Sequence, residues 1–552
     1  MPKLQKHLID KGTHFERHYV TVALCCPSRV SLWTGLAAHN TNVTDVNPPH
    51  GGYPKFISQG FNENWLPLWL QQAGYNTYYT GKLFNAHTVG NYHSPFVSGF
   101  NGSDFLLDPY TYDYLNATFQ RNHDAPVSHE GEYSTDLIIE KGLGLIDDGL
   151  AARADESRPF FVTIAPIAPH SNVQGTRSAT ANTTAIYTNR SSAAAEDYIA
   201  GQFSMTAPIP AERHAHLFPD AIVPRTPNFN PDTPSGVSWV SRLPQQTDDN
   251  VAANDLFYRQ RLRSLQAVDE LVEAVVERLE AAGQLDNTYI FYSSDNGFHI
   301  GQHRLQPGKE CGFEEDVNVP LIVRGPGVAQ GRVVQDTVTT HTDLAPTFLG
   351  LAGGPIRDDF DGLVIDVHTT APGAAGEEEE EEAHANGKNH RRRPRNEHVN
   401  VEYWGNAYIE GQYDPGRIRN NTYKALRLVG EDYNLYYSVY CSGEHELYDL
   451  NVVARLDSLL LVLKSCKASA CTDPWRVLHP DGRVHDLHDA LAPEFDHFYD
   501  SEQERVAFSR CELGYIIDAE GPQDVKAFGG ADELDIRAAF MPRGGEHWAD
   551  LV

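Results

Sequence analysis

The sequence contains no apolar run long enough to cross a membrane. A spanning helix needs about 20 consecutive, mainly apolar residues, and no stretch of the 552-residue chain provides them. Positive charge is also scarce, because 44 lysine and arginine residues stand against 75 acidic residues and leave a net charge of −31. Such a charge disfavours nucleic acid and anionic membrane as partners. We therefore expect a protein with no membrane span and no nucleic acid partner.

A secretory leader is also missing. Met1 is followed by Pro-Lys-Leu-Gln-Lys and not by an apolar segment. The chain nevertheless carries Asn-x-Ser/Thr triplets, which suit a secreted or lumenal glycoprotein. The six acceptors are Asn42, Asn101, Asn116, Asn182, Asn189 and Asn420. We therefore expect a secreted or lumenal protein whose leader is not present in this chain.

Cysteine is sparse, with seven residues in the chain. Six of them, all except Cys25, are consistent with disulfides, and Cys466 and Cys471 are close enough to close a short loop. The sequence leaves the connectivity open.

Helical and extended patterns alternate along the first two thirds of the chain. Leucine and valine recur at three- and four-residue steps over 254–282, which predicts a long helix, and 137–150 is helical too. Apolar runs at 76–80, 159–165, 289–292 and 319–323 predict buried strands. This order predicts an α/β fold with a largely parallel sheet, covered by helices on both faces. Lys82, His170 and Asp295 each follow a predicted strand, at the edge where such sheets bind ligands.

The stretch from Cys25 to Gly35, CCPSRVSLWTG, is the feature around which the chain is organised. Pro27 suits the first turn of a helix, so Cys25 lies at a helix N-terminus, where a negative charge is favoured. Arg29 lies about one turn further on and can hold an oxyanion. A cysteine in such surroundings is a candidate nucleophile. Alternatively, Cys25 and Cys26 are small buried hydrophobic residues or disulfide partners.

This stretch resembles the signature of the formylglycine-dependent sulfatases, Cys-x-Pro-Ser-Arg-x-x-Leu-x-Thr-Gly, at every fixed position. The resemblance implies that a formylglycine-generating enzyme oxidises Cys25 to formylglycine. One hydroxyl of the hydrated aldehyde then attacks sulfur and expels an alcohol, and deprotonation of the other releases sulfate. The implied activity is hydrolysis of a sulfate ester, in a small molecule or a sulfated glycan, to an alcohol or phenol and sulfate.

Further residues match functional positions of the family. Lys82, in Tyr-Thr-Gly-Lys, resembles the lysine that holds the sulfate and the aldehyde hydrate, and Lys309, in Pro-Gly-Lys-Glu, resembles the lysine that contacts sulfate and the leaving group. His170, in Ala-Pro-His, resembles the histidine that protonates the leaving alkoxide or orients sulfate. Together with Arg29 these residues supply the positive charge that the transition state requires.

The base that deprotonates the hydrate is less clear from the sequence. Many sulfatases place a histidine two residues after the equivalent of Lys82, but this chain has Phe84 there. We favour His87 as the base, with Asn85 as a hydrogen-bonding substitute.

Asp295 and Asn296 resemble the calcium-binding segment of the family, in which both side chains and an oxygen of the formylglycine at Cys25 bind one Ca²⁺. By itself, Asp-Asn-Gly would be an ordinary turn. His299 and His303 could suggest zinc, but Gly301 lies between them and no third ligand is near in the sequence.

The chain departs from the family at its beginning, because it lacks an apolar strand that ends in two adjacent aspartates. About three ligands then remain where Ca²⁺ usually takes 6–8 oxygens. We expect an N-terminal truncation, an incomplete calcium site, poor Ca²⁺ binding and low activity of this chain.

The resemblance is closest to arylsulfatases and N-acetylglucosamine-6-sulfatases and implies an alkaline-phosphatase-like fold. It predicts a catalytic domain over 1–370 and a C-terminal α+β subdomain over 399–552, in which 423–429 and 434–440 alternate like antiparallel strands. Residues 371–398, with an acidic run and a basic run, are expected to form a disordered insertion, or to include a basic processing site. Two alternatives remain: a phosphonate or phosphate ester hydrolase of the same fold, and a non-catalytic remnant.

Overall fold

The computed structural model describes residues 1–175, 203–368, 397–410, 417–430, 432–447 and 450–529. Of the predicted insertion, 371–398, only Glu397 and His398 are described, and the rest lies outside the described residues.

A five-stranded sheet carries one side of the site. Its strand order is β6-β5-β4-β3-β7, in which β3 pairs in parallel with β4 and β7, and the outer pairs β4–β5 and β5–β6 are antiparallel. The central strand β3 is buried along its whole length, as expected for a strand covered on both faces. The strand bounds are Asn76–Lys82 (β3), Gly102–Leu106 (β4), Asn116–Arg121 (β5), Val127–Glu130 (β6) and Phe160–Ala165 (β7).

A second, four-stranded sheet has the order β10-β11-β1-β12. Strand β11 is antiparallel to both of its neighbours, and only β1 and β12 pair in parallel. Its bounds are Thr13–Phe15 (β1), Ile290–Tyr292 (β10), Leu321–Arg324 (β11) and Arg332–Val334 (β12).

The expectation of one largely parallel sheet was therefore wrong, because the strands divide into two mixed sheets. Residues 293–320 join β10 to β11 with no helix longer than α11, Glu314–Val317. A parallel connection needs a crossover, usually a helix, so this connection returns the chain antiparallel. Apolar runs in the sequence carry no information on strand direction.

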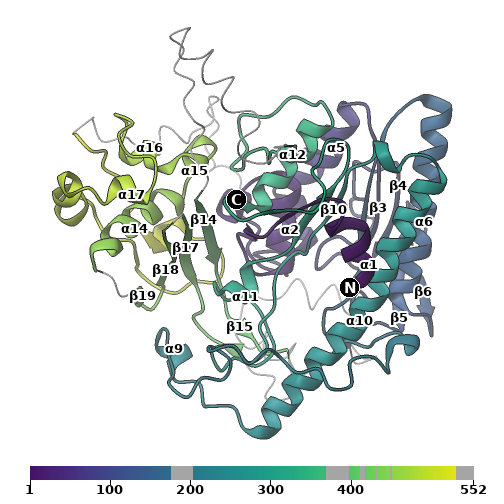
Figure 1. Cartoon of the computed structure of the whole chain (residues 1–552), viewed down its shortest axis with the longest axis horizontal. Helices are drawn as coiled ribbons and strands as arrows, with labels where there is room; N and C mark the ends of the chain where they lie inside the picture. Colours follow the sequence, from purple (N-terminus) through teal and green to yellow (C-terminus); the bar gives the residue numbers. More distant parts are fainter. Residues whose placement is uncertain (176–202, 369–396, 411–416, 431, 448–449, 530–552) are drawn as a thin grey trace.

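Helices cover both faces of the five-stranded sheet, as predicted (Figure 1). On one face α6, Ser134–Glu156, packs against β3 and β7, and α10, Asp248–Ala281, packs against α6. The other face carries an apolar cluster contributed by α2, Cys25–Thr34, α5, Leu66–Gln72, and α12, Leu344–Leu351. Helix α10 begins before the predicted residue 254, because Thr247 forms a capping box with Asn250.

The C-terminal region contains a separate antiparallel sheet, of order β14-β17-β18-β19, with helices α14 to α17 packed beside it (Figure 1). The two strands predicted there match β17, Tyr423–Val429, and β18, Asn434–Tyr440. The other bounds are His398–Tyr403 (β14), His445–Glu446 (β19), Leu450–Leu463 (α14), Ser469–Thr472 (α15), Pro474–Leu478 (α16) and Leu487–Ala490 (α17).

Two disulfides form among the cysteines. Cys466 pairs with Cys471, as their spacing allowed, and Cys441 pairs with Cys511. Cys25, Cys26 and Cys311 are free and buried. Within the described part of the chain, no helix combines the length and the apolar character that a membrane crossing requires.

Candidate functional site

Helix α2 places Cys25 in its first turn. Leu24 precedes the helix in an extended conformation, and Gly35 ends it in the left-handed conformation that favours glycine. Burial by itself would raise the pKa of the Cys25 thiol, but the ammonium groups of Lys309 and Lys82 outweigh burial and bring the pKa down to about 6. The structure thus confirms a cationic surrounding for Cys25, and the disulfide alternative is excluded because this cysteine is free.

Arg29 and Lys82 meet at the carboxylate of Asp295. Arg29 Nε donates to Asp295 Oδ2 at 2.7 Å, and Arg29 Nη1 donates to the carbonyl oxygen of Lys82 at 2.5 Å. Lys82 Nζ lies 3.6 Å from the same carboxylate oxygen. Burial would raise the pKa of Asp295, but these two cations hold it well below the usual range. Residues far apart in the sequence therefore form one charged cluster beside Cys25.

Lys309 and His170 form the other side of the cluster. Lys309 Nζ lies 3.2 Å from His170 Nε2, and His170 Nδ1 lies 2.8 Å from the carbonyl oxygen of Ser171. Because a carbonyl oxygen only accepts, Nδ1 carries the ring proton and Nε2 accepts from the lysine. Lys309 and His170 each lower the pKa of the Cys25 thiol, so both lie close to it. Both predicted residues therefore lie at Cys25, joined to each other.

Two residues of this site, Tyr112 and Glu410, were missed by the sequence reasoning. The ring of Tyr112 stacks on His170 with centroids 4.0 Å apart, and Lys82 Nζ lies 4.9 Å from the centre of the same ring. Glu410 forms an ion pair with Lys309 at 3.0 Å and accepts from Ser171 Oγ at 2.6 Å. No motif marks these positions, since Tyr112 follows β4 within a segment without clear periodicity and Glu410 comes from the C-terminal region.

The donor set at Asp295 and Asn296 fits a hard cation. Asn296 Nδ2 donates to the carbonyl oxygen of Gly297 at 2.7 Å, whereas Asn296 Oδ1 is buried and has no hydrogen-bond partner among the described residues. A buried acceptor without a donor is costly unless a ligand supplies the missing interaction. An amide oxygen beside an ionised carboxylate is the ligand type that Ca²⁺ takes.

His87 lies in an aromatic surrounding. Its ring packs against Tyr53 at 4.3 Å and against Phe105 at 5.6 Å. Burial lowers the pKa of His87 to about 3, which makes it a weak base. Asn85 Nδ2 instead donates to the hydroxyl of Tyr112 at 2.8 Å, so Asn85 supports a ring of the site. The role of His87 as the base stays a prediction.

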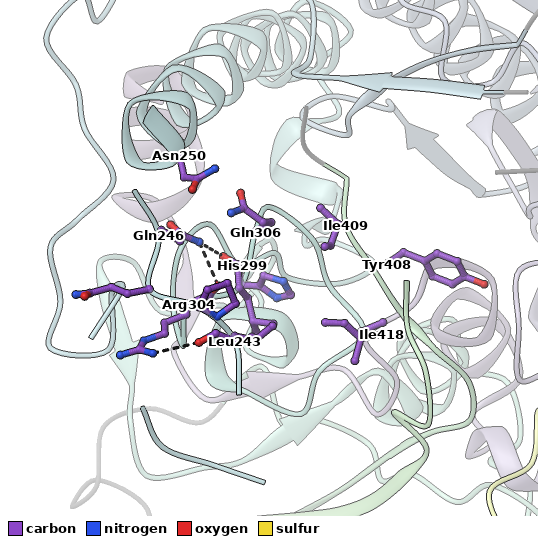
Figure 2. A pocket seen from close by; sticks show the side chains of 13 residues that line it. Leu243, Gln246, Asn250, His299, Arg304, Gln306, Tyr408, Ile409 and Ile418 are labelled. Atoms are coloured by element: carbon purple, nitrogen blue, oxygen red, sulfur yellow. Dashed lines mark hydrogen bonds between the residues drawn. The ribbon is translucent and has the colours of Figure 1, made fainter. Parts of the chain in front are cut away.

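A cavity of about 210 Å³ is lined by apolar side chains, amides, His299 and Arg304 (Figure 2). Two segments that reach the site also line this cavity: Gln306 lies three residues before Lys309, and Ile409 directly precedes Glu410. His299 lines the cavity too, with Nδ1 held by Asp316 at 2.8 Å. His299 is therefore fixed in place by a carboxylate.

A family model described as Sulfatase matches residues 1–354. An arylsulfatase of Volvox carteri is 37% identical over 526 residues, covering 90% of this chain and 76% of that protein. An arylsulfatase of Chlamydomonas reinhardtii is 36% identical over 544 residues, covering 94% of this chain and 78% of that protein.

A similar solved structure is that of BT4656 in complex with its substrate D-glucosamine-2-N,6-O-disulfate. It superposes with a TM-score of 0.53 at 20% sequence identity and covers 80% of this chain and 86% of that chain. At this identity the likeness concerns the fold alone.

Proposed function

The chain belongs to the sulfatase family, has its alkaline-phosphatase-like fold and hydrolyses sulfate esters, and we propose that it does so through a formylglycine formed at Cys25. The observation that carries this proposal is the convergence of Lys82, Lys309 and His170 on the Cys25 side chain. The sulfatase relatives favour sulfate over the phosphonate or phosphate esters considered above.

Once Cys25 is oxidised by a formylglycine-generating enzyme, one hydroxyl of the hydrated aldehyde would attack sulfur while the bond from sulfur to the alcohol oxygen breaks. Deprotonation of the second hydroxyl would then restore the aldehyde and release sulfate. Lys82, Lys309 and Arg29 oppose the negative charge of the sulfuryl oxygens, in a buried site where fixed charges act strongly. His170 would protonate the leaving oxygen or orient the sulfate; to act as the acid, its Nε2, which accepts from Lys309, must first gain a proton.

We propose one Ca²⁺ as the cofactor, held by Asp295, Asn296 and an oxygen of the oxidised Cys25. The partnerless Asn296 Oδ1 supports this assignment. When bound, the ion would add a further positive charge next to the sulfuryl oxygens. These three residues account for part of the 6–8 oxygens that Ca²⁺ usually takes.

We propose that the protein is secreted or lumenal and acts on an aryl sulfate or a sulfated glycan. Two disulfides support an oxidising compartment. Asn101 and Asn420, two of the predicted glycosylation acceptors, are exposed.

The experiment is expression together with a formylglycine-generating enzyme, followed by mass spectrometry of the peptide that contains residue 25 and by assays with matched aryl sulfate and aryl phosphate. We expect the aldehyde at position 25 and faster hydrolysis of the sulfate. Cys25→Ala, which cannot form the aldehyde, should lose activity by at least about 10⁴-fold. Unmodified cysteine in a fully active protein would contradict the mechanism, and a preference for phosphate would contradict the substrate.

Calorimetric titration with Ca²⁺ tests the cofactor and the remnant alternative together. Saturable binding that is lost in Asn296→Ala supports the proposed site. Equal binding by both proteins would place the ion elsewhere.

A further inference from the structure

Glu410 is a buried carboxylate at the reaction site that none of the proposed steps uses. Its side chain is 5% exposed and that of its partner Lys309 is 4% exposed. We propose that Glu410 is a positioning residue, which aims the ammonium group of Lys309 at the leaving oxygen and fixes its contact with His170. This inference rests on the proposed function and adds to it a residue from the C-terminal region.

Four hydrogen-bonded contacts close a ring around the carboxylate. Glu410 Oε1 lies 3.0 Å from Lys309 Nζ, which donates to His170 Nε2 at 3.2 Å. His170 Nδ1 donates to the carbonyl oxygen of Ser171, whose hydroxyl donates to Glu410 Oε2 at 2.6 Å. Both carboxylate oxygens are thus occupied, and each member of the ring fixes the next.

Within the described part of the chain, the ring leaves one proton of the Lys309 ammonium group without an acceptor. An ammonium group has three donors, of which Glu410 and His170 take two. The third is therefore the one available to a sulfate ester, and its direction is set by the other two. Without Glu410 the ammonium group could rotate, and its alignment with the leaving oxygen would be lost, although its charge would remain.

The backbone holds Glu410 in register with Lys309. Glu410 N donates to the carbonyl oxygen of Pro307 at 2.8 Å, and Ile409 forms a β-bridge with Gly308. Figure 2 shows Ile409 facing the segment that carries His299 and Gln306. The carboxylate and the lysine therefore come from two paired segments and move together.

The same carboxylate opposes binding of an anion. Burial would raise the pKa of Glu410, but Lys309 and His170 bring it down to about 2, so the group is ionised at neutral pH. A negative charge 3.0 Å from the cation that contacts sulfate weakens the field that attracts sulfate. Loss of the charge should therefore separate binding from turnover, because sulfate binding depends on the charge of residue 410 and turnover on the direction of the Lys309 ammonium group.

The test is Glu410→Gln in the full chain, compared with Glu310→Gln. Glu310 is the neighbouring buried carboxyl, and it accepts from Tyr408 N at 2.9 Å. Burial raises the pKa of Glu310 well above its usual value, so the control substitution removes less negative charge than the same change at Glu410. The measurements are calorimetric binding of inorganic sulfate and kcat for aryl sulfates of good and poor leaving groups.

For Glu410→Gln we expect inorganic sulfate to bind roughly 3- to 10-fold more tightly. We expect kcat to fall roughly 100-fold for a poor leaving group and less than about 10-fold for a good one, because proton delivery matters most for the poor one. The control should match the wild type in both measurements. Weaker sulfate binding, or equal losses of kcat for both leaving groups, would overturn the proposal.

A second variant covers the case in which Glu410→Gln fails to fold. Ser171→Ala opens the ring but keeps the carboxylate, so it should reproduce the leaving-group effect without tighter sulfate binding. An unchanged leaving-group dependence would overturn the proposal. If the wild type binds sulfate but turns over no sulfate ester, the proposed function fails, while weaker sulfate binding by Glu410→Gln would still overturn this inference separately.

Discussion

Tyr112 connects two functional side chains of the site through one aromatic ring. The ring stacks on His170 and lies under the ammonium group of Lys82, while its hydroxyl accepts from Asn85. A cation over a ring face gains about 0.5–2 kcal/mol, depending on how far it is desolvated. The ring, more than the hydroxyl, therefore holds the two side chains in place.

We predict that Tyr112→Leu lowers kcat/KM roughly 10- to 30-fold, the value of one desolvated cation–π contact. Tyr112→Phe keeps the ring and should stay within about 3-fold of wild type. The measurement is aryl sulfate hydrolysis at matched pH, with circular dichroism to check folding. If Phe proves as damaging as Leu, the hydroxyl is the functional group and the stacking argument is wrong.

Glu397 makes stability depend on pH. Burial is the main reason that its pKa rises to about 8, although Trp475 Nε1 at 2.9 Å and Leu487 N at 3.1 Å donate to it. Because the unfolded value is about 4.3, the folded state binds this proton more tightly. That stabilisation is complete below about pH 4.3 and is lost as the pH rises to about 8.

We therefore predict that Glu397→Gln, a permanently neutral analogue of the protonated acid, loses less stability than wild type as the pH rises from about 4.3 to about 8. Thermal unfolding followed across this window measures the difference. At about pH 4.3 residue 397 is neutral in the folded state of both wild type and Glu397→Gln, so the difference in stability measured there is the reference for the rest of the window. Melting curves that stay parallel over the whole window would contradict the prediction.

At the scale of elements, α6 shows how a helix is fitted to the sheet it covers. A Cβ on Gly142 would lie 2.8 Å from the side chain of Ile164 on β7, whereas a Cβ on Gly144 would meet nothing within 4 Å. The two glycines lie in the same helix, and only one of them faces the sheet. Gly142 therefore permits close packing, and Gly144 only lowers the helix propensity.

We predict that Gly144→Ala stabilises the protein by roughly 0.5–1 kcal/mol, because alanine loses less backbone entropy in a helix. Gly142→Ala gains the same stabilisation from backbone entropy but must displace Ile164. We therefore expect it to be less stable than Gly144→Ala. Urea unfolding of the two variants gives the comparison. The packing argument is wrong if both substitutions stabilise equally.

At the scale of the whole molecule, the C-terminal region is joined to the rest by buried charges. Glu402 on β14 accepts from His39 and from Lys424 Nζ, at 2.8 Å and 2.7 Å, and all three side chains are nearly inaccessible. Glu402 N also donates to the carbonyl oxygen of Thr21, in the segment that leads to α2. Together with Glu410, these contacts make the C-terminal region a structural part of the site.

The two disulfides should contribute unequally to the stability of this region. Cys441–Cys511 closes a separation of 70 residues and Cys466–Cys471 one of 5. From loop-closure entropy we expect Cys441→Ser with Cys511→Ser to cost about 4 kcal/mol, and the pair of substitutions at 466 and 471 about 2 kcal/mol. Denaturant unfolding measures both. A larger loss of unfolding free energy on removal of Cys466–Cys471 would show that native contacts, and not loop entropy, dominate.

Much of the molecule was predictable from local patterns. The Cys25–Gly35 stretch predicted a helix entry with a reactive cysteine, and Lys82, His170 and Asp295 were expected at one edge because each follows a strand. The strands at 423–429 and 434–440 were found at their predicted bounds. These features depend on neighbours in the sequence, through helix geometry, side-chain alternation and the turn residues that end each element.

Contacts between distant segments were decided by the tertiary structure alone. The direction of β11, the placing of Tyr112 between Lys82 and His170, and the pairing of Glu410 with Lys309 each join residues that no local pattern relates. The aromatic surrounding of His87, which makes it a weak base, has the same origin. The sequence by itself determined which groups carry the chemistry. Only the packing of the chain decided their protonation and orientation, because burial and distant charges control both.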